Sequence, residues 1–214
     1  MQASIQPIFT WSRNRVFAGA SQNLVLLVEW KGVSQQEDKK SRKLVAREIE
    51  LRIWLESHMT FTEAYGCSAE AGEGRSLLLK LGKIHSGYRK FIALEFITES
   101  MPAGLHEALW MQWQYRQPPV ERIRELPLQK LGLEYTHHTD VLGSESSFHV
   151  EKHVELLKSV NVLEDAALLR NRNADPLVCE KVRRQADKLL LLAARSGDMQ
   201  LVKEAELMYK QLEA

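Results

Sequence analysis

The sequence lacks most of the features that mark secreted or membrane-spanning proteins. It has 2 cysteines among 214 residues, Cys67 and Cys179, which are too few for a disulfide framework. Its apolar runs, such as Leu24–Val28 and Leu189–Ala194, are far shorter than the ~20 residues that span a bilayer. The first residues have neither the basic nor the apolar region of a signal peptide. We therefore expect a cytoplasmic protein with free thiols and no membrane span.

Neither sign of charge is in excess. The 29 lysines and arginines stand against 28 aspartates and glutamates, which gives a formal net charge of +1. A nucleic-acid-binding domain usually has a high isoelectric point and a basic stripe, so the composition predicts no nucleic-acid partner. The one dense basic cluster lies at residues 39–43, where Glu37 and Asp38 partly neutralise it. We interpret this cluster as part of a solvated linker.

Catalytic and phosphate-binding motifs are also missing from the sequence. There is no Gly-x-Ser-x-Gly elbow to position a nucleophilic serine. The segment 71–75 has two glycines, but it lacks the third glycine and the Lys-Ser/Thr pair of a phosphate-binding loop, and a hairpin turn explains it better. We therefore expect a protein that is not an enzyme, with no catalytic residues and no cofactor.

The histidines offer the main alternative to that expectation. His149 and His153 are four residues apart and would share one face of a helix, a spacing that can hold zinc. His137 and His138 are adjacent and would point to opposite faces of a strand. No Cys-x-x-Cys or His-Glu-x-x-His motif supplies further ligands, so we predict no metal site. A small metal-dependent or cryptic enzyme that uses His149 and His153 remains the alternative.

Residues 1 to about 142 have the period of β-strands. Ile49, Leu51 and Ile53 alternate with Glu50 and Arg52, as in a strand with one buried face. Similar patterns, with glycine and proline turn signals between them, predict about eight strands, at residues 5–11, 15–18, 24–30, 49–55, 77–81, 92–96, 109–115 and 131–135. Short alternating strands of this kind favour an antiparallel β-sandwich.

Residues 147–214 change to the period of helices. We expect a first helix that begins after Ser147, is interrupted or kinked near residues 161–163 and continues over 163–169, then a break at 171–176. Asp175 and Pro176 are a strong start for the next helix. Gly197 and Asp198 suit the end of that helix and the start of the last one. The fold class is therefore α+β, a β-sandwich domain at 1–142 followed by a C-terminal helical bundle or hairpin at 147–214.

Two tryptophans occupy the polar faces of predicted strands. Trp54 follows Glu50 and Arg52 in its alternation, and Trp110 precedes Gln112 and Gln114. Tryptophan exposed on a sheet marks a contact surface, since aromatic residues are enriched in interfaces. The interpretation we favour is that the C-terminal helices cover this face and bury both side chains. Trp54 and Trp110 are nevertheless the candidate interaction surface of the chain.

Several stretches, in the same order along the chain, resemble bacterial von Willebrand factor A (vWA) proteins. Residues 4–30 resemble the strands that precede the A domain, and residues 43–53 resemble the strand that follows it. The segment 81–91 resembles the family's next hairpin, and 194–198, with the sequence Ala-Arg-Ser-Gly-Asp, resembles its closing helical hairpin. The resemblance covers most of the chain, and the order of the stretches is its main support.

The resemblance implies a vWA protein without its A domain. The metal-binding motif of that domain, Asp-x-Ser-x-Ser, is absent, since no aspartate has a serine two residues later. The linker at 33–43 is where the A domain would be inserted. The chain is then either a natural relative that lacks the A domain or one from which the domain has been removed.

The resemblance implies a non-enzymatic function. The chain would be a protein-interaction or scaffold module that supports an A domain in vWA-type proteins. Its protein partner is not identifiable from the sequence. A third possibility is that the helical region 147–214 drives homo-oligomer formation.

Overall fold

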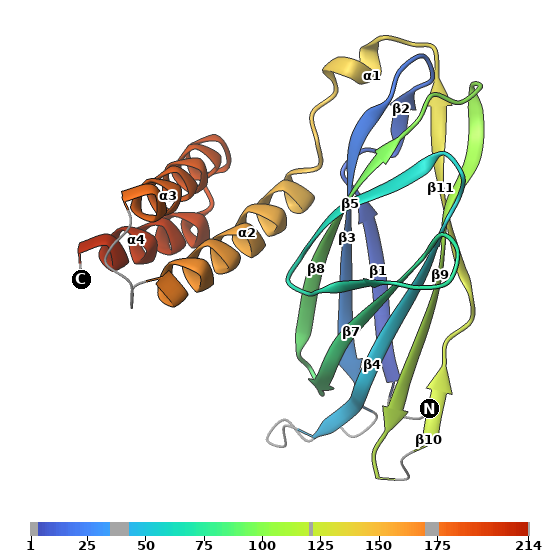
Figure 1. Ribbon diagram of the computed structural model, residues 1–214, viewed down its shortest axis with the longest axis horizontal. Helices are drawn as coiled ribbons and strands as arrows, with labels where there is room; N and C mark the ends of the chain where they lie inside the picture. Colours follow the sequence, from blue (N-terminus) through green and yellow to red (C-terminus); the bar gives the residue numbers. More distant parts are fainter. Residues whose placement is uncertain (1–3, 35–42, 120–121, 170–175, 214) are drawn as a thin grey trace. The chain divides into compact units, whose positions relative to one another are not determined.

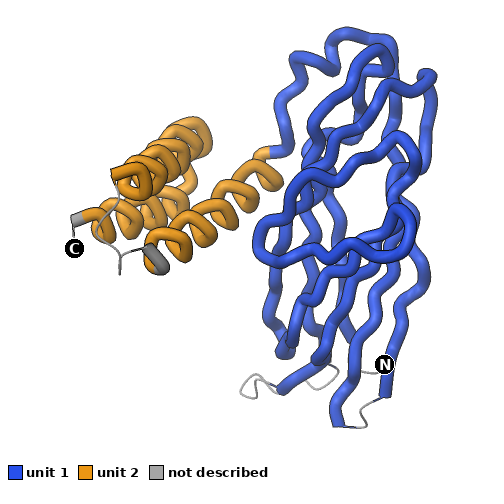
Figure 2. Tube along the Cα trace, in the orientation of Figure 1, with its two compact units in different colours: residues 1–147 blue, residues 148–214 orange. Residues whose placement is uncertain are grey.

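The computed structural model describes residues 4–34, 43–119, 122–169 and 176–213. It forms two compact units, the β unit of residues 1–147 and the helical unit of residues 148–214 (Figure 2). Most of the predicted linker at 33–43 lies outside the described residues.

The β unit is built from strands with one short helix, α1 (Asp140–Gly143). Its described strands are β1 (Ser4–Trp11), β2 (Arg15–Phe17), β3 (Gln22–Val33), β4 (Leu44–Leu55), β5 (Met59–Tyr65), β6 (Ala69–Ala71), β7 (Ser76–His85), β8 (Arg89–Thr98), β9 (Gly104–Gln117), β10 (Arg122–Glu125) and β11 (Gln129–Thr136). Each of the eight predicted strands corresponds to one of these, while β5, β6 and β10 were not predicted.

The strands form two sheets (Figure 1). One has the order β1-β3-β8-β5, and the other has the order β2-β11-β9-β4-β7-β6, with β10 paired to β9. The strand pairs are antiparallel, except that β2 and β11 run parallel. The predicted α+β class with a mainly antiparallel pair of sheets is therefore confirmed.

A single apolar core lies between the two sheets. Ile49, Leu51 and Ile53 of β4 are buried as the alternation predicted. The opposite sheet contributes Trp30, whose ring centroid lies 5.8 Å from that of Trp113 in β9. Burial of large aromatic and aliphatic side chains on facing sheets is what stabilises a sandwich.

The helical unit contains α2 (Phe148–Leu169), α3 (Pro176–Ser196) and α4 (Met199–Glu213). Its buried core residues are apolar and include alanines, namely Val182, Ala186, Leu189, Leu192, Ala193, Leu201, Ala205 and Met208. Buried alanines allow two helices to pack closely, since they add little volume between the helix axes.

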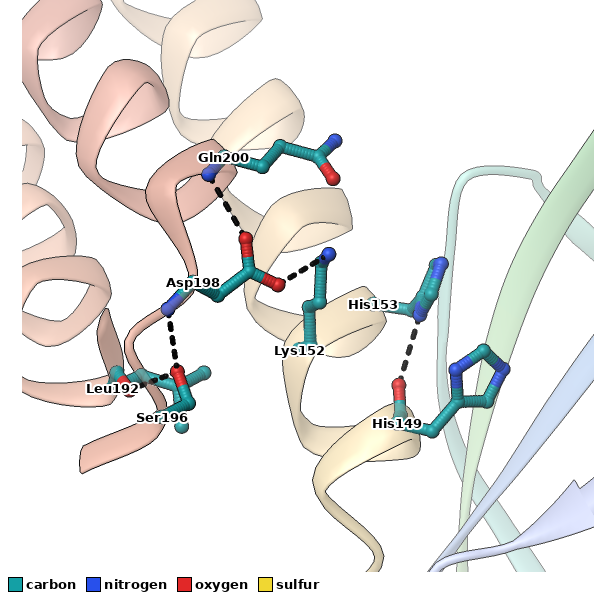
Figure 3. Close-up of polar contacts among 7 residues, drawn as sticks. All are labelled: His149, Lys152, His153, Leu192, Ser196, Asp198 and Gln200. Atoms are coloured by element: carbon teal, nitrogen blue, oxygen red, sulfur yellow. Dashed lines mark hydrogen bonds and ion pairs between the residues drawn. The ribbon is translucent and has the colours of Figure 1, made fainter. Parts of the chain in front are cut away.

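The turn between α3 and α4 has the predicted caps. Gly197 has a φ of 71°, and its amide donates to the carbonyl oxygen of Ala193 over 2.7 Å. This is a left-handed cap that only glycine adopts readily. Asp198 then accepts a hydrogen bond from the amide of Gln200 over 2.9 Å, as an N-cap does (Figure 3).

One prediction about the helices is wrong, and another concerns residues outside the described ranges. The interruption expected near 161–163 is wrong, because α2 runs unbroken from Phe148 to Leu169. Asn161 and Asp165 are weak helix formers, but the packing of α2 on α3 outweighs their low propensity. The predicted break at 171–176 lies outside the described residues, except for its last residue, Pro176, where α3 begins. No described helix is long and apolar enough to cross a membrane.

Candidate interaction surfaces

Trp54 and Trp110 are neighbours on the outward face of the larger sheet. They are direct register partners of β4 and β9, so their Cβ atoms are within side-chain reach of each other. The alternation in the sequence predicted that each tryptophan lies on the polar face of its own strand, but it did not predict that β4 and β9 are neighbours. The pairing turns two separate tryptophans into one surface, the tryptophan pair.

The cross-strand neighbours of the tryptophan pair include a residue of β11. Lys130 is the register partner of Trp110, and its Nζ lies 3.9 Å from the centroid of the Trp110 ring. Such a cation–π contact is worth about 0.5–1 kcal/mol at an exposed site. Lys130 also forms a 2.8 Å ion pair with Glu107. The lysine thereby holds the Trp110 ring in place beside Trp54.

The two tryptophans differ in exposure. Trp54 retains 38% of its surface, and Trp110 is half-buried. The interpretation that the C-terminal helices cover both side chains stays a prediction. The polar alternation of β4, with Glu50 and Arg52 on the same face, is the signal that pointed to this exposure.

The two histidines of the alternative prediction lie one helical turn apart in α2. Their ring centroids are 4.5 Å apart, and Nδ1 of His153 hydrogen-bonds to the backbone carbonyl of His149 over 2.8 Å (Figure 3). A carbonyl oxygen accepts, so Nδ1 carries the proton and cannot bind a metal. Within the described ranges, no group of three His, Cys, Asp or Glu side chains has the geometry of a metal site.

Cys67 does not resemble a nucleophile. Both thiols are unpaired, and burial raises the pKa of Cys67 to about 11. The thiolate is the reactive form of cysteine, so Cys67 is almost wholly unreactive at neutral pH.

A surface cleft of about 410 Å³ lies in the β unit between the β1–β2 turn and α1. Its lining includes Arg13 and Arg15 but also Asp140 and Glu145. Arg15 is already paired with Glu134 over 3.3 Å. Because charged side chains of both signs line the cleft, it favours neither anions nor cations. No sequence pattern indicated the cleft, since its walls come from segments more than 120 residues apart.

One buried histidine lies at the end of the sandwich that holds the β4–β5 turn. His58 is 6% exposed, and its ring packs edge-on against Tyr135, 5.9 Å between centroids. Tyr135 hydrogen-bonds to Thr98 and also contacts His106. Burial lowers the pKa of His58, against the opposing effect of the Glu56 carboxylate. His58 is therefore neutral in the folded chain at pH 7.

The ends of β3 and β4 meet at the β7–β8 turn. The amide of Gly32 donates to the carbonyl of Tyr88 over 3.1 Å, and the amide of Gly87 donates to the carbonyl of Gly32 over 2.9 Å. On the other side, the amide of Ser86 donates to the carbonyl of Lys43 over 2.9 Å. One turn therefore anchors both strand ends, and we call this arrangement the strand junction.

Glycine is required at the strand junction. A Cβ at Gly32 would clash with the backbone carbonyl of His85. Backbone atoms cannot move aside as the end of a flexible side chain can. The close approach of β3 to the turn therefore depends on the absence of a side chain at residue 32.

Comparison with known proteins gives structural matches alone. No protein-family model matches the chain, and no curated protein matches it. The crystal structure of the ArnB paralog VWA2 from Sulfolobus acidocaldarius matches with a TM-score of 0.57 and 7% identity, over 94% of this chain and 93% of that one. The von Willebrand factor type A structure from Catenulispora acidiphila matches with a TM-score of 0.52 and 15% identity, over 75% of this chain.

The present chain spans 38% of the length of the Catenulispora acidiphila protein. At such low identities, structural likeness establishes the fold and no more. The chain therefore has a fold related to that of vWA-type proteins.

Proposed function

We propose that the chain is a non-enzymatic protein-interaction module and the support region of a vWA-type protein. The tryptophan pair carries this proposal. It holds two large side chains side by side on the outward face of a sheet, and Trp54 is 38% exposed. A rigid, partly exposed tryptophan supplies much contact area at little cost in conformational entropy, which is why interface hot spots are rich in it.

The surroundings of the pair suit a protein partner. Charged residues of both signs lie on the same face, with Arg52 beside Glu50 and Lys130 beside Glu107. An apolar centre with a mixed polar rim is the usual composition of a protein–protein interface. The expected partner places an apolar side chain against Trp54 and polar groups around it.

The finer part of the proposal, support of an A domain, draws on the strand junction. Because Gly32 and Lys43 bind the same turn, the chain leaves and re-enters the sandwich at neighbouring points. A domain can be inserted where the two ends of a surface segment lie close together. We propose that 33–43 is this position, that the A domain is absent from it in this chain, and that the protein is cytoplasmic, in keeping with its two unpaired thiols.

The test is a binding comparison with a matched control. The wild-type chain and the double variant Trp54→Ala/Trp110→Ala are used as bait in cells of the source organism, beside Ile8→Ala, which removes an exposed apolar side chain from β1 in the other sheet. A partner captured by the wild type and the control is then purified. We expect the double variant to bind it at least about 30-fold more weakly, the effect of losing about 2 kcal/mol at a hot spot. Equal binding by all three chains would overturn the proposal.

Metal analysis separates this proposal from the enzymatic alternative. Protein purified without chelators is assayed for zinc, together with His149→Ala and His153→Ala variants. We expect no stoichiometric metal in any of them. Zinc bound one-to-one and lost in the His149→Ala variant would contradict the non-enzymatic proposal.

A further inference from the structure

The cleft between the β1–β2 turn and α1 is lined by opposite charges that do not pair with each other. Arg13 belongs to one wall, and Asp140 and Glu145 belong to the other. Within the ranges that the structure describes, none of these three side chains forms an ion pair. Arg15, also in the lining, is already engaged by Glu134. The described lining therefore offers one guanidinium and two carboxylates that have no charged partner.

Backbone hydrogen bonds hold the two walls of the cleft together. The amide of Ser12 donates to the carbonyl of Val25 over 2.7 Å, and the carbonyl of Ser12 accepts the amide of Ser147 over 2.9 Å. The carbonyl of Asn14 accepts the amide of Glu134 over 3.1 Å. In addition, α1 lies against β2 (Figure 1). The charged side chains are therefore carried by an ordered backbone, and a ligand would cost little further backbone order.

Both walls of the cleft, at residues 10–15 and 140–147, are described without a gap. The cleft lies at the Trp11 end of β1. The gaps in the described part of the β unit adjoin the opposite strand ends, at Ser4, Val33 and Gln117.

A ligand with charge of a single sign fits this lining poorly. An anion such as inorganic phosphate would meet the guanidinium of Arg13 but also two carboxylates. A divalent cation would meet the carboxylates but also the guanidinium, and the part of the chain that is described contains no metal-binding group of three His, Cys, Asp or Glu side chains. Juxtaposed like charges weaken binding, whereas a ligand that carries both signs can place each beside its opposite.

We propose that the cleft binds a small zwitterion, namely an unblocked peptide of two or three residues. Its terminal carboxylate would pair with the Arg13 guanidinium, which suits bidentate contact with a carboxylate, and its ammonium group would pair with Asp140 and Glu145. Capture of chain termini by their charge is a recurring mode of peptide recognition.

The size of the cleft agrees with such a ligand. Its volume of about 410 Å³ lies within the range of about 300–1,000 Å³ that is usual for small-molecule sites. An extended dipeptide spans about 7 Å, so its two charges are farther apart than those of a direct ion pair. This separation is what unpaired opposite charges on two walls require. The lining also includes the buried apolar residues Trp11 and Val141, which suit an apolar side chain of the peptide.

The proposed site goes beyond the function proposed for the tryptophan pair. It uses other residues and takes a small ligand in place of a protein surface. Trp54→Ala/Trp110→Ala should therefore bind the peptide as the wild type does, and the two proposals can fail independently of each other.

The probes are the unblocked peptides Ala-Ala, Leu-Leu and Ala-Ala-Ala, each compared with its N-acetylated and its C-amidated form. Binding to the full chain is measured by ligand-observed NMR titration. The variants are Arg13→Gln and Asp140→Asn/Glu145→Gln. Two controls make the same changes elsewhere: Arg15→Gln removes the arginine that Glu134 already engages, and Glu164→Gln/Asp165→Asn removes two exposed carboxylates of the helical unit.

We expect at least one unblocked peptide to bind the wild type with a Kd below about 1 mM. Blocking either terminus, or introducing either variant, should weaken its binding at least about tenfold, and both controls should stay within a factor of about two. In Arg13→Gln, amidation should have no further effect, because the partner of the carboxylate is gone. Absence of binding by all three peptides, equal binding of the blocked forms, or equal loss in Arg15→Gln would overturn the proposal. Tighter binding of inorganic phosphate or Ca²⁺ than of every peptide would overturn it as well.

Discussion

The β unit and the helical unit are stabilised by different kinds of core. In the β unit, the packed residues are far apart in the sequence, as with Trp30 and Trp113, and all five tryptophans of the chain belong to this unit. In the helical unit, the apolar core consists of alanine, valine, leucine and methionine side chains, and α3 and α4, which pack on each other, are consecutive helices. The β core therefore depends on large aromatic side chains that fill the space between the sheets, and the helical core combines aliphatic side chains with alanines that let the helices approach.

The largest expected effect is the removal of a large side chain from the β core. Trp113→Ala deletes a fully buried indole and should lower the free energy of unfolding of the β unit by about 3–5 kcal/mol. Urea unfolding followed by the fluorescence of the four remaining tryptophans reports on this unit. An unchanged urea midpoint would show that the core is not held by its large residues.

The reverse substitution tests the helical core. Ala205→Leu adds volume at a fully buried position and should destabilise the helical unit by about 1–3 kcal/mol through overpacking. Far-ultraviolet circular dichroism in urea is the measurement. Glu206→Leu is the control, since this neighbour is exposed and should change stability by less than about 0.5 kcal/mol. If Ala205→Leu is as mild as the control, close helix packing does not limit this unit.

A third prediction concerns the strand junction. Gly32→Ala forces a Cβ against the carbonyl of His85 and should cost the β unit about 1–3 kcal/mol. Gly143→Ala is the matched control, because a Cβ there meets no atom and its φ is not positive. Tryptophan fluorescence in urea should separate the two variants. Similar midpoints for both would mean that β3 does not depend on its close approach to the turn.

Lowering the pH should reduce the free energy of unfolding of the two units in different pH ranges. The folded β unit holds His58 neutral because burial lowers its pKa, whereas in the unfolded chain it titrates near 6.5. The unfolded state then binds more protons below that pH, so the stability of the β unit should fall as pH falls below about 6.5. Urea midpoints from fluorescence, measured from about pH 8 to about pH 5, check this. His58→Gln should remove most of this pH dependence, and an equally steep fall in the variant would assign it to other groups.

The helical unit should respond only at lower pH. The Lys152 hydrogen bond lowers the pKa of Asp198 below its usual 3.8, and the two groups lie 2.6 Å apart between α2 and the start of α4 (Figure 3). This contribution is present above that pH and is lost as pH falls through the lowered value. Lys152→Met should therefore cause a small loss of helical stability at neutral pH and none in strong acid. A loss that persists when Asp198 is protonated would point to packing of the lysine stem.

The sequence predicted those parts of the fold that follow a simple period. The alternation in β4 and the caps at Gly197 and Asp198 are local signals, and the structure has both. The strands that were missed have a signal that is short or interrupted, as in β5, where the register shifts between Phe61 and Glu63. β5 is an edge strand whose Thr60, Thr62 and Glu63 side chains face water, and β6 and β10 have three and four residues.

Bulges also obscured the boundaries of the long strands. In β4 the register shifts around Glu48, which has a φ of 48°, and Val45 and Ala46 are both buried. A bulge places two successive residues on one side of the strand and so breaks the period of two. The regular alternation is therefore readable only from residue 49 onward, within a strand that begins at Leu44.

The candidate surfaces show the same limit. The polarity of β4 pointed to an exposed face at Trp54, but its pairing with Trp110 depends on the order of strands in the sheet. Long-range pairing is not encoded by any local pattern, so such surfaces are visible only in the folded chain.

The strand junction has a consequence for how the chain could change length between β3 and β4. The hydrogen bonds of Gly32 and Lys43 to the turn fix both ends of the intervening segment whatever its length. Closing a loop between fixed ends costs entropy that grows only logarithmically, by about 0.6 kcal/mol for each doubling of its length. Gain or loss of a whole domain at this point would therefore alter the stability of the sandwich by little, and lineages could exchange long and short versions without redesigning the core.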